Sequence, residues 1–161
     1  MKYRRLSNDE LKELEPEFVK FLASNHVTAD DWVKMKEDNP KKVEGLIEVF
    51  SDIVFDKILK KVDYLEFKTP NDLKIFHCQP EKIVMMGLFI EGKSDLDFTQ
   101  TLQPNEMMEK FRTSGANLKL YSAEKAYKNG REAELFKMME NGCLIVKDGT
   151  LFNLLSSLRG K

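Results

Sequence analysis

The sequence predicts an α+β protein in which an N-terminal helical subdomain packs on a largely antiparallel sheet, with alternating helices and strands at the C-terminal end. Apolar residues recur at helical spacing through the first third of the chain, and after Lys61 they follow the shorter period of strands. The connections between strand-like runs are short, which favours antiparallel neighbours. We expect a single domain over residues 1–161, with the helical subdomain at 1–61 and the α+β portion at 62–161.

Capping signals mark the helices of the first third. Residues 7–10 (Ser-Asn-Asp-Glu) have the pattern of a capping box, and Pro16 predicts a kink or two short pieces in the helix that follows. Residues 28–31 repeat the capping pattern and open a short helix that carries Trp32. Pro40 begins a third helix, in which apolar residues cover one broad face. They are Val43, Leu46, Ile47, Phe50, Ile53, Val54 and Ile58.

Four strand-like runs follow, and turn-forming residues between them predict a four-stranded meander. The runs are 64–68, 73–79, 82–91 and 96–102. After these runs we expect a helix that begins at Pro104 and a fifth strand at 117–122. A helix at 131–141 should follow and end before Gly142, which is suited to a left-handed cap. The chain then continues with a short strand at 143–146 and a terminal amphipathic helix.

The composition is typical of a soluble globular protein, with 42% hydrophobic and 33% charged residues in a chain of 161. No apolar run reaches the roughly 18 residues of a membrane helix, and the basic N-terminus lacks the apolar segment of a secretory signal. We therefore expect a cytoplasmic protein without membrane contact. The net charge of −1 argues against general nucleic-acid binding, which normally requires a basic stripe.

Both cysteines and two of the three methionine doublets are expected in the core. Cys78 and Cys143 lie in apolar runs, which predicts buried free thiols in a reducing compartment. Of three methionine doublets, we assign Met85-Met86 and Met138-Met139 to the core and leave Met107-Met108 open between core and binding surface.

An acidic series along the third helix is the most informative feature of the chain. Its members recur every four residues and are Glu44, Glu48, Asp52 and Asp56. Stacked like charges repel on a helix, so a partner is expected to offset them. Apolar Phe55, Leu59 and Val62 follow the same side, outside the main apolar face. This combination predicts a partner-binding face consisting of Glu48, Asp52, Phe55, Asp56 and Leu59.

Two other interpretations of this face stay open. The acidic residues can point to water while Phe55 and Leu59 form a second core layer, or the apolar side of the helix can close a homodimer. A dinuclear metal site is disfavoured because it needs Glu-x-x-His spacing, and the two histidines, His26 and His77, lie elsewhere. We predict no metal or cofactor site.

A weak catalytic signal lies at Asp95 and Asp97. Alternate acids on a strand hold Mg²⁺ against a triphosphate in nucleotidyltransferases. That family also has a Gly-Ser pair upstream, whereas Gly87 here is followed by Leu88. His77 and Cys78 are adjacent, so their side chains point to opposite faces of a strand and cannot form a catalytic pair. No catalytic residue is predicted, and a metal-dependent nucleotidyl- or phosphoryl-transfer enzyme is kept as the alternative function.

Several segments together resemble an uncharacterised family of short bacterial cytosolic proteins of the Bacteroidota type, a domain of unknown function. The resemblance is carried by residues 1–6 (Met-Lys-Tyr-Arg-Arg-Leu), the helix with Phe18 and Phe21, residues 29–32, and residues 49–55. It implies a single cytosolic domain and supplies no catalytic residues. The leading hypothesis is therefore a non-catalytic protein-binding or regulatory module that uses the N-terminal helical region.

Overall fold

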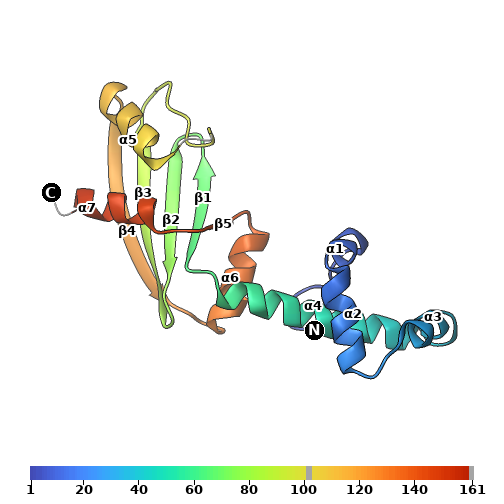
Figure 1. Cartoon of the computed structure of the whole chain (residues 1–161). Coiled ribbons are helices and arrows are strands. Elements are labelled where there is room, and N and C mark those ends of the chain that lie inside the picture. The colour runs from blue at the N-terminus through green and yellow to red at the C-terminus, as the bar shows by residue number, and fades with distance from the viewer. Residues whose placement is uncertain (101–102, 160–161) are drawn as a thin grey trace. The chain divides into compact units, whose positions relative to one another are not determined.

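The computed structural model describes residues 1–100 and 103–159, and its elements are labelled in Figure 1. The described residues form seven helices and one five-stranded antiparallel sheet, which confirms the predicted α+β class. The chain divides into two compact units, Met1–Lys60 and Lys61–Lys161. None of the helices in the described ranges has the length and apolar composition needed to cross a membrane.

The first unit is helical. Its helices are α1 (Asn8–Glu13), α2 (Glu15–Ser24), α3 (Ala29–Asp38) and α4 (Pro40–Lys60). Both predicted capping boxes are present, with Ser7 Oγ accepting from the Glu10 N–H and Thr28 Oγ1 from the Asp31 N–H. Pro16 lies in the first turn of α2, where its missing N–H leaves no carbonyl unpaired. The segment is therefore two short helices.

Aromatic rings join α2, α3 and α4. The Phe18 ring meets the Trp32 ring edge-on with centroids 5.2 Å apart and lies 4.9 Å from that of Phe50. Beyond Phe50, Ile53 and Ile58 are 50% and 41% exposed. The apolar face predicted along all of α4 is thus buried mainly over its first half. Buried aliphatic residues of this unit include Leu6, Leu22, Val43 and Ile47.

The second unit is built on the sheet. Its strands are β1 (Tyr64–Thr69), β2 (Asp72–Cys78), β3 (Lys82–Glu91), β4 (Asn117–Ala126) and β5 (Leu144–Val146). They lie in the order β4-β3-β2-β1-β5, and each neighbouring pair is antiparallel. The consecutive strands β1 to β3 form the first three strands of the predicted four-stranded meander.

The prediction of a strand at 96–102 is wrong. Residues 96–100 form a loop, and residues 101–102 lie outside the described ranges. The Asp97 carboxylate accepts a hydrogen bond from the Thr99 N–H at 2.8 Å, which closes a turn and prevents an extended backbone. Phe98 is only 2% exposed, and its N–H donates to the Pro70 carbonyl at 3.1 Å. The apolar residues of this run thus belong to a buried loop.

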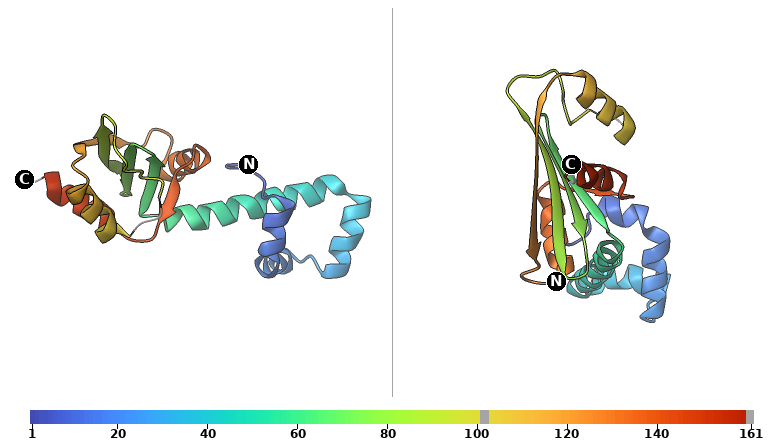
Figure 2. Two further views of the ribbon diagram at one scale, coloured as in Figure 1. Left: turned by 90° about the horizontal axis from the view of Figure 1, so that it is seen from above. Right: turned by 90° about the vertical axis from the view of Figure 1, so that its left-hand side faces the viewer.

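Two of the helices cover one face of the sheet. Both α5 (Pro104–Thr113) and α7 (Thr150–Arg159) lie on the same side of it (Figure 2). Between them in sequence, α6 (Arg131–Glu140) is followed by Asn141 and then by Gly142, whose φ of 108° confirms the predicted left-handed cap. On the other face of the sheet, Phe67, Phe76, Met85 and Phe89 are partly exposed. The buried core of the covered face comprises Leu73, Ile75, Met86, Leu88, Ile90, Phe98, Met107, Leu151, Phe152 and Leu155.

Candidate functional site

Acidic residues of α4 are bound by the first residues of the same chain, which we call the N-terminal strap (residues 2–5). The backbone N–H groups of Lys2 and Tyr3 donate to the Asp52 carboxylate at 2.9 and 3.1 Å. The Tyr3 hydroxyl and the Lys2 ammonium group both donate to Asp56, the ammonium group at 3.3 Å. Lys2 and Tyr3 thus supply donors to two of the four acids in the series.

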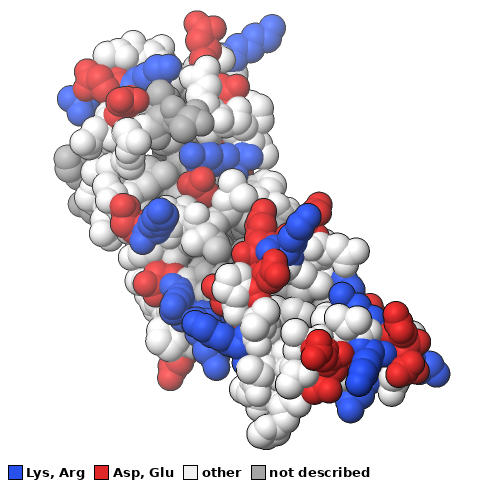
Figure 3. All heavy atoms as spheres, turned by 45° about the vertical axis from the view of Figure 1, so that its right-hand side comes forward, with Lys and Arg blue, Asp and Glu red and all other residues white. Residues whose placement is uncertain are grey.

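Two arginines of the strap bind further carboxylates. Arg5 donates to Glu44 from Nε at 2.7 Å and from Nη2 at 3.1 Å. Arg4 makes two hydrogen bonds to Glu10 of the first capping box, at 2.8 and 3.1 Å. Such paired bonds are stronger than single ones, and the Arg5 cation offsets repulsion along α4. Basic and acidic side chains are also mixed over the face shown in Figure 3.

The strap is anchored at Leu6, the residue that follows it. Leu6 is 2% exposed, and its N–H donates to Ser51 Oγ at 2.9 Å. Ser51 is fully buried and donates in turn to the Ile47 carbonyl at 2.7 Å. A serine inside an otherwise apolar helix face was the sequence signal for this contact, and the sequence analysis missed it.

The carboxylates of the predicted partner-binding face differ in exposure. Glu48 is exposed, whereas Asp52 and Asp56 are partly buried and bound by the strap. The strap is therefore an intramolecular partner of the acidic series. It supplies the hydrogen-bond donors and positive charges that offset the repulsion between the carboxylates, as the sequence led us to expect.

The apolar members of that face are also covered. Phe55 is partly buried, with its ring centroid 5.9 Å from that of Tyr3 and 5.0 Å from the Arg4 guanidinium carbon. Leu59 is fully buried, so it offers no surface to a partner. An incoming protein would have to displace the strap to reach Phe55.

Acid should release the strap from α4. Hydrogen bonds from Arg4 and from the Ser7 backbone lower the pKa of Glu10 to about 2. Hydrogen bonds from Arg5 and Tyr3 lower the pKa values of Glu44 and Asp56. Because the folded-state values lie below the unfolded ones, the stabilisation is complete above the ordinary glutamate pKa of 4.5 and is lost as the pH falls toward 2.

The measurement is the amide NMR signal of Leu6 followed from pH 6 to about pH 2. We expect it to move to the position of an unstructured residue within that window. Glu10→Gln and Glu44→Gln should shift part of the transition, and Glu37→Gln at the exposed end of α3 should leave it unchanged. A Leu6 signal that stays constant to pH 2 would show that these ion pairs do not hold the strap.

The first unit also contains an open groove, which we call the helical groove. Its volume is about 740 Å³, and it lies between α1, α2, α3 and the first half of α4. Two of its valines, Val19 and Val33, are 56% and 58% exposed. Trp32 also lines the groove, and the Lys36 ammonium group lies 5.6 Å from the centroid of its ring. Further lining residues are Leu11, Phe18, Val27 and Ile47.

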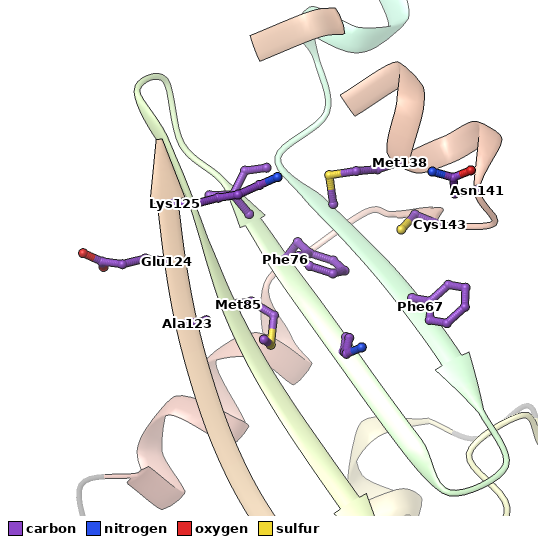
Figure 4. Close-up of a pocket in the computed structure, with 11 residues that line it drawn as sticks. Phe67, Phe76, Met85, Ala123, Glu124, Lys125, Met138, Asn141 and Cys143 are labelled. Atoms are coloured by element: carbon purple, nitrogen blue, oxygen red, sulfur yellow. The ribbon is translucent and has the colours of Figure 1, made fainter. Parts of the chain in front are cut away.

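A second groove lies on the open face of the sheet, and we call it the sheet groove. Its volume is about 450 Å³ (Figure 4). Phe67, Phe76 and Met85 come from the strands, and Met138 points toward them from α6. Met85 and Met138 thus line a groove, whereas the sequence placed both in the core. Met86 and Met107 are buried in the core cluster.

The acids of the alternative enzyme hypothesis are not arranged as that hypothesis requires. Asp95 and Asp97 lie in a loop rather than on a strand. Asp97 is engaged in the turn with Thr99, which lowers its pKa through hydrogen bonds from the Thr99 hydroxyl and N–H. No group of three or more His, Cys, Asp or Glu side chains suited to a metal ion is present among the described residues.

A family model matches residues 1–160, and its description is a family of unknown function, DUF6495. The chain belongs to this family. The match confirms the resemblance to an uncharacterised family that the sequence indicated. Neither a curated protein nor a solved structure gives a significant match.

Both cysteines of this DUF6495 chain are buried free thiols, as the sequence predicted. Burial raises the pKa of Cys78 to about 12 and also raises that of Cys143. A thiol with a raised pKa is rarely a thiolate near neutral pH and so is a poor nucleophile. His77 stacks on Tyr64 with centroids 4.6 Å apart and meets the Phe152 ring edge-on, so it packs beside the core.

Proposed function

We propose that this DUF6495 protein is a non-catalytic protein-binding module whose helical groove takes an amphipathic helix of a partner protein. The observation that carries the proposal is the exposure of Val19 and Val33 beside the partly buried Trp32 in a concave surface. Apolar surface concentrated in one groove is typical of an interaction site. The proposed binding region is again in the N-terminal helical unit. It is the helical groove, however, and not the face of α4 that the strap occupies.

The dimensions of the groove suit a short helix. Its walls α2 and α3 are 10 residues each, a length of about 15 Å at 1.5 Å per residue. A partner helix of three turns would place apolar anchors at positions i, i+3 or i+4, and i+7 along such a groove. Trp32 and Phe18 would be the main contacts, because aromatic residues dominate interface energies.

Charges at the rim favour an acidic partner helix. Arg5 and Glu44 line the groove but already bind each other. The other charged lining residues are Lys12, Lys36 and Glu15, so the lysines outnumber the acid. Acidic residues beside the apolar stripe of the partner would complement these lysines and raise the association rate.

Aspartate substitutions at the exposed valines test this site. Val33→Asp and Val19→Asp should each weaken capture of the partner about tenfold or more, because a charge would enter a desolvated contact. Both should change the free energy of unfolding by no more than about 0.5 kcal/mol, as surface substitutions normally do. The measurement pairs quantitative capture from the native host with a thermal melt of each variant.

Photo-crosslinking identifies what contacts the groove. A photoreactive amino acid at position 33 should crosslink to one protein, and the same group at Lys57, which is exposed on α4, should not. Crosslinks to a second copy of this chain would instead support the homodimer alternative. Equal capture by the wild type and both aspartate variants would rule out the helical groove.

A further inference from the structure

The register of the sheet arranges the sheet groove as an apolar floor between two lysines. Phe76 pairs with Met85, and Met85 pairs with Ala123, so their side chains form one row across three strands. Lys74 lies two residues before Phe76 on β2, and Lys125 lies two residues after Ala123 on β4. Side chains two residues apart on a strand share a face, so both lysines flank the row on the open side. The groove therefore has an apolar centre and a cation at each end.

From this arrangement we propose that the sheet groove binds a small amphipathic anion, a carboxylate carried on an apolar chain. Its volume of about 450 Å³ lies within the range of small-molecule sites, about 300–1,000 Å³. The Phe76 row and Met138 would contact the apolar chain, and a lysine would bind the carboxylate. Methionine suits such a wall because its flexible side chain adapts to ligands of different shape.

Both lysines can exchange their present partners for a ligand. Lys74 lies 3.5 Å from Asp72, which also accepts a hydrogen bond from the Tyr121 hydroxyl. Lys125 lies 3.1 Å from Glu134, which also accepts from the Lys128 N–H at 2.6 Å. Each acid thus keeps a donor when its lysine turns to an incoming carboxylate. The lysine side chains of these pairs are 37% and 59% exposed, so solvent screens each ammonium group and weakens its ion pair.

The size of the groove favours a single chain of carbon atoms over a peptide helix. A helix with its side chains is about 10–12 Å across. This groove has a volume of about 450 Å³ and is smaller than the helical groove of about 740 Å³. Asn141 and Cys143, which follow α6, also line the groove. A fatty carboxylate fits these limits.

Titration of the full chain with decanoate, below its micelle concentration, tests the proposal by calorimetry. We expect saturable one-to-one binding, with decanol binding at least tenfold more weakly because it lacks the charge. Lys74→Met and Lys125→Met should each weaken decanoate binding, and the double variant should weaken it tenfold or more. The matched control is Lys119→Met, which removes a lysine from the same face of β4 that pairs with Glu91 at 2.9 Å outside the groove.

Filling the groove provides a second, charge-independent test. Phe76→Trp adds volume to the floor, and Met138→Trp adds it from the α6 side, so one can replace the other if a variant fails to fold. Either folded variant should lose decanoate binding. Absent binding in the wild type, equal affinity for decanol and decanoate, or wild-type affinity in a filled variant would each overturn the proposal. So would a concentration-dependent dimer that the filled variants dissociate, because the occupant would then be a second copy.

Discussion

Replacing Phe98 by Ala should lower the free energy of unfolding by about 3–5 kcal/mol, the usual loss when a buried phenyl ring is deleted. Phe98 is 2% exposed, and its ring meets that of Phe111 edge-on at 5.5 Å. Its N–H also ties the loop to the Pro70 carbonyl. The side chain thus fills the core from an irregular segment, and its removal would leave a cavity that the short turn at Asp97 cannot close.

Phe89→Ala is the matched control, because it deletes the same ring from the open face of the sheet. Phe89 is 36% exposed, so Phe89→Ala should lower the free energy of unfolding by clearly less than Phe98→Ala does. Urea denaturation of both variants measures the difference. Equal losses in the two variants would mean that the loop at 96–100 is not part of the core.

Gly87→Ala should cost about 1–3 kcal/mol of stability, the range for overpacking a filled site. Gly87 lies directly opposite Tyr121 on β4, and a Cβ atom at position 87 would overlap the Tyr121 ring. The ring cannot move aside freely, since its hydroxyl donates to Asp72 on β2. Burial and this hydrogen bond raise the pKa of Tyr121. The Tyr121 side chain therefore extends from β4 across β3 at Gly87 and reaches Asp72 on β2.

A double variant isolates the steric cause. In a Tyr121→Ala background the same Gly87→Ala change should cost less than about 0.5 kcal/mol or stabilise the strand, because alanine loses less backbone entropy than glycine. Thermal melts of the two single variants and the double variant give the coupling free energy between the two substitutions. Independent, additive losses would contradict the contact between ring and glycine.

The parts of the fold that local chemistry determines were predictable. Capping boxes need only residues three apart, and both appeared where Ser7 and Thr28 were read as caps. The change of period after Lys61 likewise marked the start of the sheet. The predicted strand at 96–102 failed because apolar residues in a buried loop and in a strand look alike over a few positions.

Most of the candidate sites depend on contacts between distant residues, which a single sequence does not display. The acidic series on α4 correctly signalled a need for cations, yet the donors lie about fifty positions away in the strap. Trp32 was assigned to the helical subdomain, where it packs on Phe18, but its place in an open groove depends on how α2 and α3 meet. The row of Phe76, Met85 and Ala123 requires the register of three strands.

The order of the strands also bears on the tendency of this chain to self-associate. β5, at one edge of the sheet, is only three residues long, but β4 at the other edge offers a run of ten. A long free edge is a template for pairing with another chain and hence for aggregation. Lys119 and Lys125 point to one side of β4 and Glu124 to the other, so an approaching strand would meet charges on both sides. Apolar replacements of these three side chains should therefore favour insoluble assemblies while leaving the core unaltered.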